Sequence, residues 1–149
     1  MTITFLDKYL RTVKNHNVTL TMKSQDLLTF INSYLTDLSV PSEAISVVNE
    51  TQEKYILFPP FNLKLICKNR LVFSDHEPFQ EISFVISNEP EIEVIKVFFS
   101  VEGRAHLNHV PEPNDVGFEL IFPDRAKEIL DNILQRLYDL DLITAKNLD

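Results

Sequence analysis

The hydrophobic positions in the first third of the chain follow two periods. Residues 3–14 carry an apolar stripe at helical spacing and are predicted to form an amphipathic helix that docks by this stripe. The stripe consists of Phe5, Leu6, Tyr9, Leu10 and Val13. Residues 18–22 alternate between apolar and polar, which predicts a half-buried strand. A second helix is expected to start at Ser24 as its N-cap, and a further short helix at Ser42.

From about residue 54 the pattern is that of β-structure, with short runs of β-branched and aromatic residues separated by Pro and Asn. Because the separators are short, we expect an antiparallel meander. The predicted strands cover residues 55–58, 63–67, 71–73, 82–86, 92–101, 104–110 and 116–122. The chain then closes with its strongest helical pattern, from Pro123 to about Leu140, with Asp124 at the N-cap or the first helical position.

This order of elements predicts an α+β fold. It consists of a mainly antiparallel sheet of about six to eight strands, with N-terminal helices and a C-terminal amphipathic helix packed on it. Strands that follow one another without intervening helices do not form a doubly wound parallel sheet. The sequence has no internal repeat and no linker rich in Gly or Ser, so residues 1–149 are expected to form a single globular domain.

Charge is distributed unevenly along the chain, whose formal net charge is −8. Residues 1–75 carry 8 basic and 7 acidic side chains, whereas residues 76–149 carry 6 and 15. An acidic surface repels phosphate backbones, so no nucleic-acid partner is expected. It would instead steer a basic protein toward the C-terminal half of the chain.

The scarcity of glycine excludes several classes of binding site. Gly103 and Gly117 are the only glycines, whereas nucleotide-binding loops need several and the nucleophile elbow of hydrolases needs the pattern Gly-x-Ser-x-Gly, which is absent. No cofactor is therefore expected. No apolar run is long enough to cross a bilayer, and Asp7 and Lys8 interrupt what would be a signal peptide, so we expect a cytoplasmic protein with no membrane partner. The single Cys67 is expected to fill core rather than act as a nucleophile.

Two histidines, His106 and His109, have the spacing of a metal-binding pair. Gly103 before them and Pro111 after them favour a strand, on which an odd separation sends the two side chains to opposite faces. If Glu102 and Gly103 form a two-residue hairpin loop, His106 lies opposite Phe99 and His109 opposite Lys96. A metal site at His106 and His109 therefore belongs only to an alternative interpretation, a small metal-assisted enzyme.

No motif in the sequence identifies a family. In profile the small acidic chain, with amphipathic helices bracketing a sheet, is similar to bacterial secretion chaperones and to toxin-neutralising immunity proteins. We therefore expect a non-catalytic protein-binding domain, an immunity-type inhibitor or an effector chaperone, that captures a basic protein with its acidic C-terminal half. The expected partner-binding residues are Glu102, Arg104, His106, Glu112, Asp115, Glu119 and Asp124. A self-associating structural subunit, such as a homodimer, is the other alternative.

Overall fold

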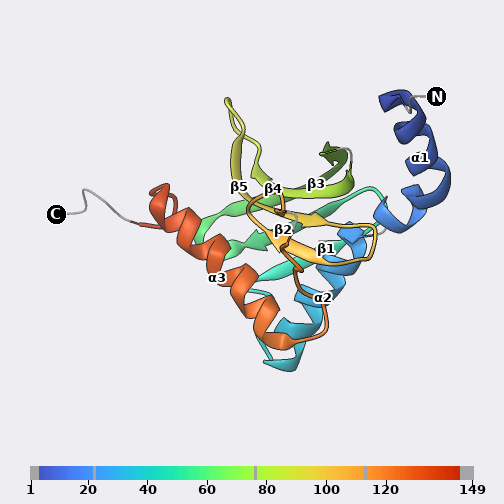
Figure 1. Ribbon diagram of the computed structural model, residues 1–149. Helices are drawn as coiled ribbons and strands as arrows, with labels where there is room; N and C mark the ends of the chain where they lie inside the picture. The colour runs from blue at the N-terminus through green and yellow to red at the C-terminus, as the bar shows by residue number, and fades with distance from the viewer. Residues whose placement is uncertain (1–3, 22, 76, 113, 145–149) are drawn as a thin grey trace.

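The structure is a computed structural model, and it describes residues 4–21, 23–75, 77–112 and 114–144. It has the expected α+β architecture, three α-helices and a six-stranded antiparallel sheet in which each strand pairs with the next along the chain (Figure 1). In chain order the elements are α1 (Phe5–Thr21), α2 (Lys23–Asp37), β1 (Ser46–Asn49), β2 (Lys54–Phe58), a 3-10 helix (Pro59–Phe61), β3 (Leu63–Ser74), β4 (Glu77–Ile86), β5 (Ile92–Phe99), β6 (Ala105–Leu107) and α3 (Pro123–Asp139).

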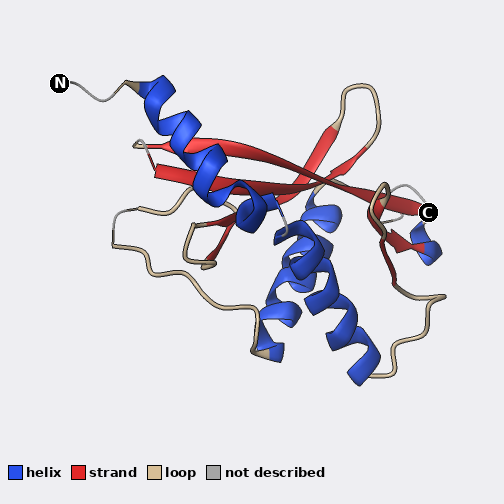
Figure 2. Cartoon of the chain, turned by 90° about the vertical axis from the view of Figure 1, so that its right-hand side faces the viewer, coloured by secondary structure: helices blue, strands red, loops and turns tan. Residues whose placement is uncertain are grey.

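The main core lies between the sheet and two of the helices. Figure 2 shows α2 and α3 together on one face of the curled sheet, whereas α1 runs separately at one end. Leu28 and Ile31 of α2 and Ile133 of α3 are fully buried in this core, as are Ile82 and Phe99 of the sheet. Burial of these side chains is the main stabilising contribution to the fold.

Helix α1 is longer than predicted, and the strand expected at residues 18–22 was wrong. The helix continues to Thr21, and Met22 lies outside the described residues. A capping box starts it: the Thr4 amide donates to Oδ2 of Asp7 at 3.0 Å, and the Asp7 amide donates to Oγ1 of Thr4 at 3.1 Å. The hydrogen bond from the Thr4 amide lowers the pKa of Asp7. No Gly or Pro stops the helix before Thr21, so helix propagation overrides the short alternating pattern.

The apolar stripe of α1 does not dock as expected. Leu6 is 62% exposed and Leu10 is 54% exposed, whereas Thr12, on another side of the helix, is buried. Phe5 contacts Phe73 of β3 edge to face, with ring centroids 5.0 Å apart. The helix therefore leaves much of its apolar surface uncovered within the chain.

Two further expectations near α2 were wrong. The helix begins at Lys23, so Ser24 lies inside the first turn instead of capping it. The region after Ser42 forms a turn followed by β1, in place of a short helix. The β-branched pair Val47 and Val48 suits a strand, and it pairs with β2.

Strand β3 is continuous, whereas two strands separated at Asn69 and Arg70 were predicted. Each of the two side chains has hydrogen-bond partners, Asn69 on one face of the sheet and Arg70 on the other, so the strand can continue through them. Nδ2 of Asn69 donates to Oγ of the buried Ser24 at 3.0 Å, and Nε2 of Gln80 donates to Oδ1 of Asn69 at 3.0 Å. Arg70 instead bonds to Glu81 on the other face.

The hairpin between β5 and β6 has a different register from the predicted one. Phe98 lies opposite His106 and Phe99 opposite Ala105, one residue away from the expected pairing. The loop has three residues, Val101 to Gly103, because the Ser100 amide donates to the carbonyl of Arg104 and the Gly103 amide donates to that of Ser100. Gly103, at φ 82°, fits the left-handed position of such a loop as well as that of the shorter one, so glycine alone did not decide the register.

The last two predicted strands are mostly absent. β6 covers only residues 105–107, and the segment expected as a strand at 116–122 makes a single bridge, between Ala105 and Phe118. Gly117, at φ 72°, precedes this bridge. α3 begins as predicted with Pro123 in its first turn, although Phe122 is the N-cap and Asp124 the second helical residue. Within the described residues, no helix is both long and apolar enough to cross a membrane.

Candidate functional site

A cavity of about 690 Å³ opens between three segments, two of them close in sequence and the third about twenty residues before them. They are the end of the β3–β4 hairpin, the β5–β6 loop and the segment from Pro111 to Glu119. We call this space the acidic cavity. Its lining residues are Ser74, Asp75, Glu77, Pro78, Phe79, Ser100, Val101, Glu102, Arg104, His106, Pro111, Glu112, Asp115, Val116 and Glu119.

The acidic cavity brings together six of the seven residues that the sequence suggested for partner binding. They are Glu102, Arg104, His106, Glu112, Asp115 and Glu119. The seventh, Asp124, is not among the lining residues, because the chain has by then turned into the first turn of α3.

The β3–β4 hairpin adds lining residues that the sequence reasoning missed. Asp75 and Glu77 contribute carboxylates, and Phe79 contributes a buried aromatic ring. No local pattern marks them, because their contribution depends on the strand pairing that brings this hairpin beside the β5–β6 loop. With them, the described part of the lining carries six carboxylates, together with the basic side chains of Arg104 and His106.

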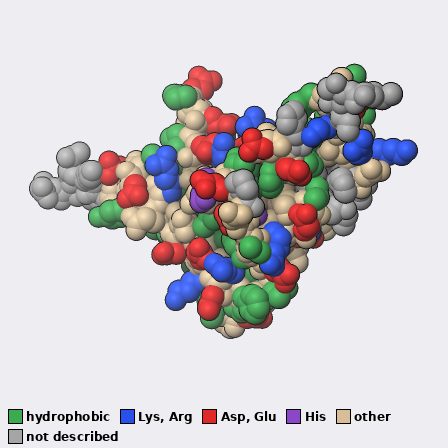
Figure 3. Space-filling view, in the orientation of Figure 1, with side chains coloured by type: hydrophobic (Ala, Val, Ile, Leu, Met, Phe, Trp, Pro, Cys, Tyr) green, Lys and Arg blue, Asp and Glu red, His purple; other side chains and the backbone are tan. Residues whose placement is uncertain are grey.

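Among the described residues, the two basic side chains that line the cavity each lie beside a carboxylate. Nη1 of Arg104 lies 3.0 Å from Oε1 of Glu119. Nδ1 of His106 lies 3.5 Å from Oδ2 of Asp115, but without the alignment of a hydrogen bond. Figure 3 shows Asp and Glu side chains (red) spread over the face of the molecule that it presents, among exposed hydrophobic side chains (green).

His106 is the most enclosed titratable group of the cavity. Its side chain is 4% exposed, and Nδ1 is buried without a hydrogen-bond partner among the described residues. The adjacent Cε1–Nε2 edge of the ring lies against Gly117, where a Cβ atom would come within 2.6 Å of Cε1 of His106 and within 2.6 Å of the Ala105 carbonyl oxygen. Glycine at position 117 therefore lets the backbone cover the imidazole closely.

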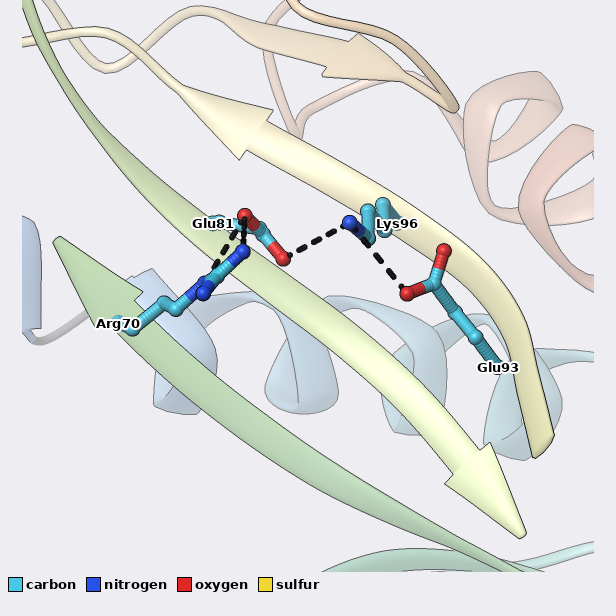
Figure 4. Close-up of polar contacts among 4 residues, drawn as sticks. All are labelled: Arg70, Glu81, Glu93 and Lys96. Carbon is cyan, nitrogen blue, oxygen red and sulfur yellow. Dashed lines mark hydrogen bonds and ion pairs between the residues drawn. The ribbon is translucent and has the colours of Figure 1, made fainter. Parts of the chain in front are cut away.

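A row of paired residues connects His106 to a charged network in the middle of the sheet. Strand pairing places Phe98 between His106 and Glu81, and Glu81 opposite Arg70. Figure 4 shows the network on the side of the strands facing away from the helix drawn behind them. Nη2 of Arg70 lies 3.1 Å from Oε2 of Glu81.

Lys96 completes this network. Its Nζ lies 3.2 Å from Oε1 of Glu81 and 3.3 Å from Oε2 of Glu93. Burial lowers the pKa of Lys96, but the hydrogen bonds and charges of Glu81 and Glu93 outweigh this effect and raise it. The ion pairs of the network thus link β3, β4 and β5 on this face of the sheet.

The residues considered for metal or thiol chemistry lie in different surroundings. β6 ends at Leu107, so His109 lies beyond the strand and is exposed, and Asn108 takes the place opposite Lys96 that was expected for His109. Among the described residues, no group of three or more His, Cys, Asp or Glu side chains is arranged to hold a metal ion. Cys67 packs against the core, and burial raises the pKa of its thiol to about 12.

Comparison of the chain with protein-family models, with curated proteins and with solved structures finds no match. The kind of ligand that the cavity could bind is therefore inferred from its lining residues alone. Carboxylates around a partly apolar lining suit a ligand that combines a positive charge with an apolar stem.

Proposed function

We propose that this protein is a non-catalytic binding domain that captures a basic protein partner at the acidic cavity. The observation that carries the proposal is the convergence of six carboxylates from three separate segments on one cavity. Such a concentration of negative charge makes the local electrostatic potential more negative and steers a positively charged partner toward the cavity. An immunity-type inhibitor and an effector chaperone would both use such a surface.

The geometry supports binding more than it supports a reaction. Arg104 is paired with Glu119 within the cavity, and the ring of His106 is held between Asp115 and Gly117. These contacts hold the two basic side chains in place, so that the carboxylates of the lining can meet a partner. A preorganised charged surface reduces the conformational entropy lost on binding.

The test is capture of partner proteins from a native lysate at low salt, followed by mass spectrometry. A first variant reverses four acids to Lys, at Glu112, Asp115, Glu119 and Asp124. A matched control variant reverses four exposed acids outside the cavity to Lys, at Glu43, Glu50, Glu53 and Asp131, which gives the same change in net charge. We expect a basic protein to be captured by the wild type and the control variant and lost in the first variant. Equal capture by the two variants, or no specific protein at all, would contradict the proposal.

A second candidate function, self-association, is favoured by the uncovered stripe of α1. Leu6, Tyr9 and Leu10 are each at least 45% exposed on one helix, and an apolar stripe of this kind is typical of a surface that meets another chain. Light scattering on the purified protein tests this candidate. A stable oligomer that dissociates in the double variant Leu6→Gln and Leu10→Gln would support it, and a monomer at all concentrations would contradict it.

A further inference from the structure

We infer that the acidic cavity receives the head group of one basic side chain, arginine or lysine, from the partner, seated between Asp115 and His106. The inference rests on the proposed function and makes it more specific. It names the chemical group that enters the cavity and the two residues that hold it.

One ring nitrogen of His106 has hydrogen-bonding capacity that the described residues leave unused. Its Nδ1 is buried and has no hydrogen-bond partner among the residues that the structure describes. A buried polar atom without a partner is unfavourable, and a ligand that supplies the hydrogen bond removes this cost. With the proton on Nε2, Nδ1 is an acceptor, so the ligand must bring a donor. Guanidinium and ammonium groups are donors that carry no acceptor.

Nδ1 of His106 and Oδ2 of Asp115 are close enough for one donor to contact both acceptors. Nδ1 of His106 and Oδ2 of Asp115 are 3.5 Å apart, so a single N–H nitrogen about 2.9 Å from each would bridge them. The Asp115 side chain helps to cover Nδ1, and its Oδ1 accepts a hydrogen bond from the Gly117 amide at 3.2 Å. Because the side chain is 40% exposed, it can shift to admit the head group at the cost of weakening that bond. The bridging nitrogen would then form a charge-assisted hydrogen bond with the carboxylate.

The rest of the lining offers both apolar and acidic side chains. Phe79, Val101 and Val116 line the same cavity and can pack against the methylene stem of an arginine or lysine side chain. Glu112 and Asp75 add negative charge around the head group, which disfavours anionic ligands. The apolar and the acidic parts of the lining thus match the two parts of a basic side chain.

The experiment titrates the ¹⁵N-labelled full chain with Nα-acetyl-arginine amide and, separately, with Nα-acetyl-lysine amide. The amide resonances of Arg104, Asp115 and Gly117 report on the cavity. We expect saturable shifts with at least one of the two probes, and their comparison distinguishes guanidinium from ammonium. Nα-acetyl-citrulline amide, a neutral analogue of the arginine probe, should cause no saturable shift.

Two variants test the named residues. Asp115→Asn removes the charge at an exposed position and should weaken binding about tenfold, as expected for the loss of a hydrogen bond between charged groups. His106→Phe keeps an aromatic ring but removes the acceptor, and should weaken binding by a similar factor. If this buried substitution prevents folding, the Asp115→Asn variant decides the question. Asp131→Asn, outside the cavity, serves as the control and should bind as the wild type does.

The inference is overturned if neither cationic probe gives saturable shifts, if the citrulline probe binds equally well, or if Asp115→Asn binds with unchanged affinity. Its failure is distinguishable from failure of the proposed function. Loss of protein capture in the four-acid variant without any binding of the probes would retain the protein-binding function and reject the seat for a basic side chain. Binding of the probes with protein capture unaffected by the four-acid reversal would instead reject the acidic cavity as the place where a protein partner is captured.

Discussion

Oε1 of Glu81 lies 3.2 Å from Nζ of Lys96, and the carboxylate that makes this contact is almost completely buried. Two cations from the neighbouring strands, Arg70 and Lys96, compensate its charge. The substitution Glu81→Gln keeps the size of the side chain but leaves Arg70 and Lys96 without the negative charge that lies between them. We expect the free energy of unfolding in urea to fall by about 2 kcal/mol, in line with the loss of hydrogen bonds to a charged group.

A matched control is available on the same face. Lys68 forms an ion pair with Glu91 in which both side chains are about half exposed. Glu91→Gln should lower the free energy of unfolding by about 0.5 kcal/mol or less, because exposed pairs are screened by solvent. Equal losses for the two variants would contradict the role assigned to burial.

The two glycines should respond differently to alanine. At Gly117 an added Cβ would lie 2.6 Å from the backbone carbonyl oxygen of Ala105, and φ is 72°. At Gly103 the nearest atom is Nζ of Lys23 at 3.3 Å, the mobile end of a long side chain, and φ is 82°. We expect unfolding free energies lower by about 3 kcal/mol for Gly117→Ala and by about 1 kcal/mol for Gly103→Ala, measured by chemical denaturation. A loss at Gly103 as large as that at Gly117 would argue against the close packing on His106.

The thiol of Cys67 should make stability depend on pH in alkaline solution. Burial raises its pKa from 9.0 to about 12. Between these values the unfolded chain loses the proton while the folded chain retains it, so the unfolded state is favoured as the pH rises. Below pH 9 this contribution is constant, and above it the free energy of unfolding should decline by at most about 1.4 kcal/mol per pH unit.

Denaturation curves at several alkaline pH values, for the wild type and for Cys67→Ala, check this dependence. The slope attributed to the thiol should be absent from the variant. At neutral pH the native thiol should react with iodoacetamide much more slowly than in denaturant, because only the thiolate is nucleophilic. Rapid alkylation of the native protein would contradict the burial of Cys67.

The exposed stripe of α1 should contribute little to the stability of the chain. We expect Leu6→Gln together with Leu10→Gln to change the free energy of unfolding of dilute protein by no more than about 0.5 kcal/mol. Leu28→Ala on α2, where the side chain is fully buried, should lower it by about 3 kcal/mol. A large loss in the α1 variant would show that the stripe packs on the chain after all.

Local patterns in the sequence predicted the elements that depend on local interactions. The period of α3 and the short connections of the meander gave the fold class correctly. The prediction of a strand at 18–22 was wrong because it rested on only five alternating residues. The helix that Thr4 and Asp7 start continues through them. The break expected at Asn69 failed because its partners, Ser24 and Gln80, lie elsewhere in the chain.

Only part of the acidic cavity could be predicted from the sequence. Its residues from 102 to 119 are close in sequence, so their common charge is visible before folding. Asp75 and Phe79 come from another hairpin, and only the pairing of β4 with β5 brings them near. The register of the β5–β6 hairpin decides the neighbours of His106, and a shift of one residue changes them all.

The unequal lengths of the strands have a consequence for solubility. β2 pairs with β3 only as far as Ile66. Among the described residues, β3 therefore has a strand neighbour only on its β4 side from Cys67 to Ser74. A bare strand edge of this length can recruit an identical edge from another molecule and start aggregation. Lys68 and Arg70 stand on this stretch with more than half of each side chain exposed, and like charges on two approaching edges repel. We therefore expect these two cations to disfavour edge-to-edge assembly along this stretch, in addition to forming their ion pairs.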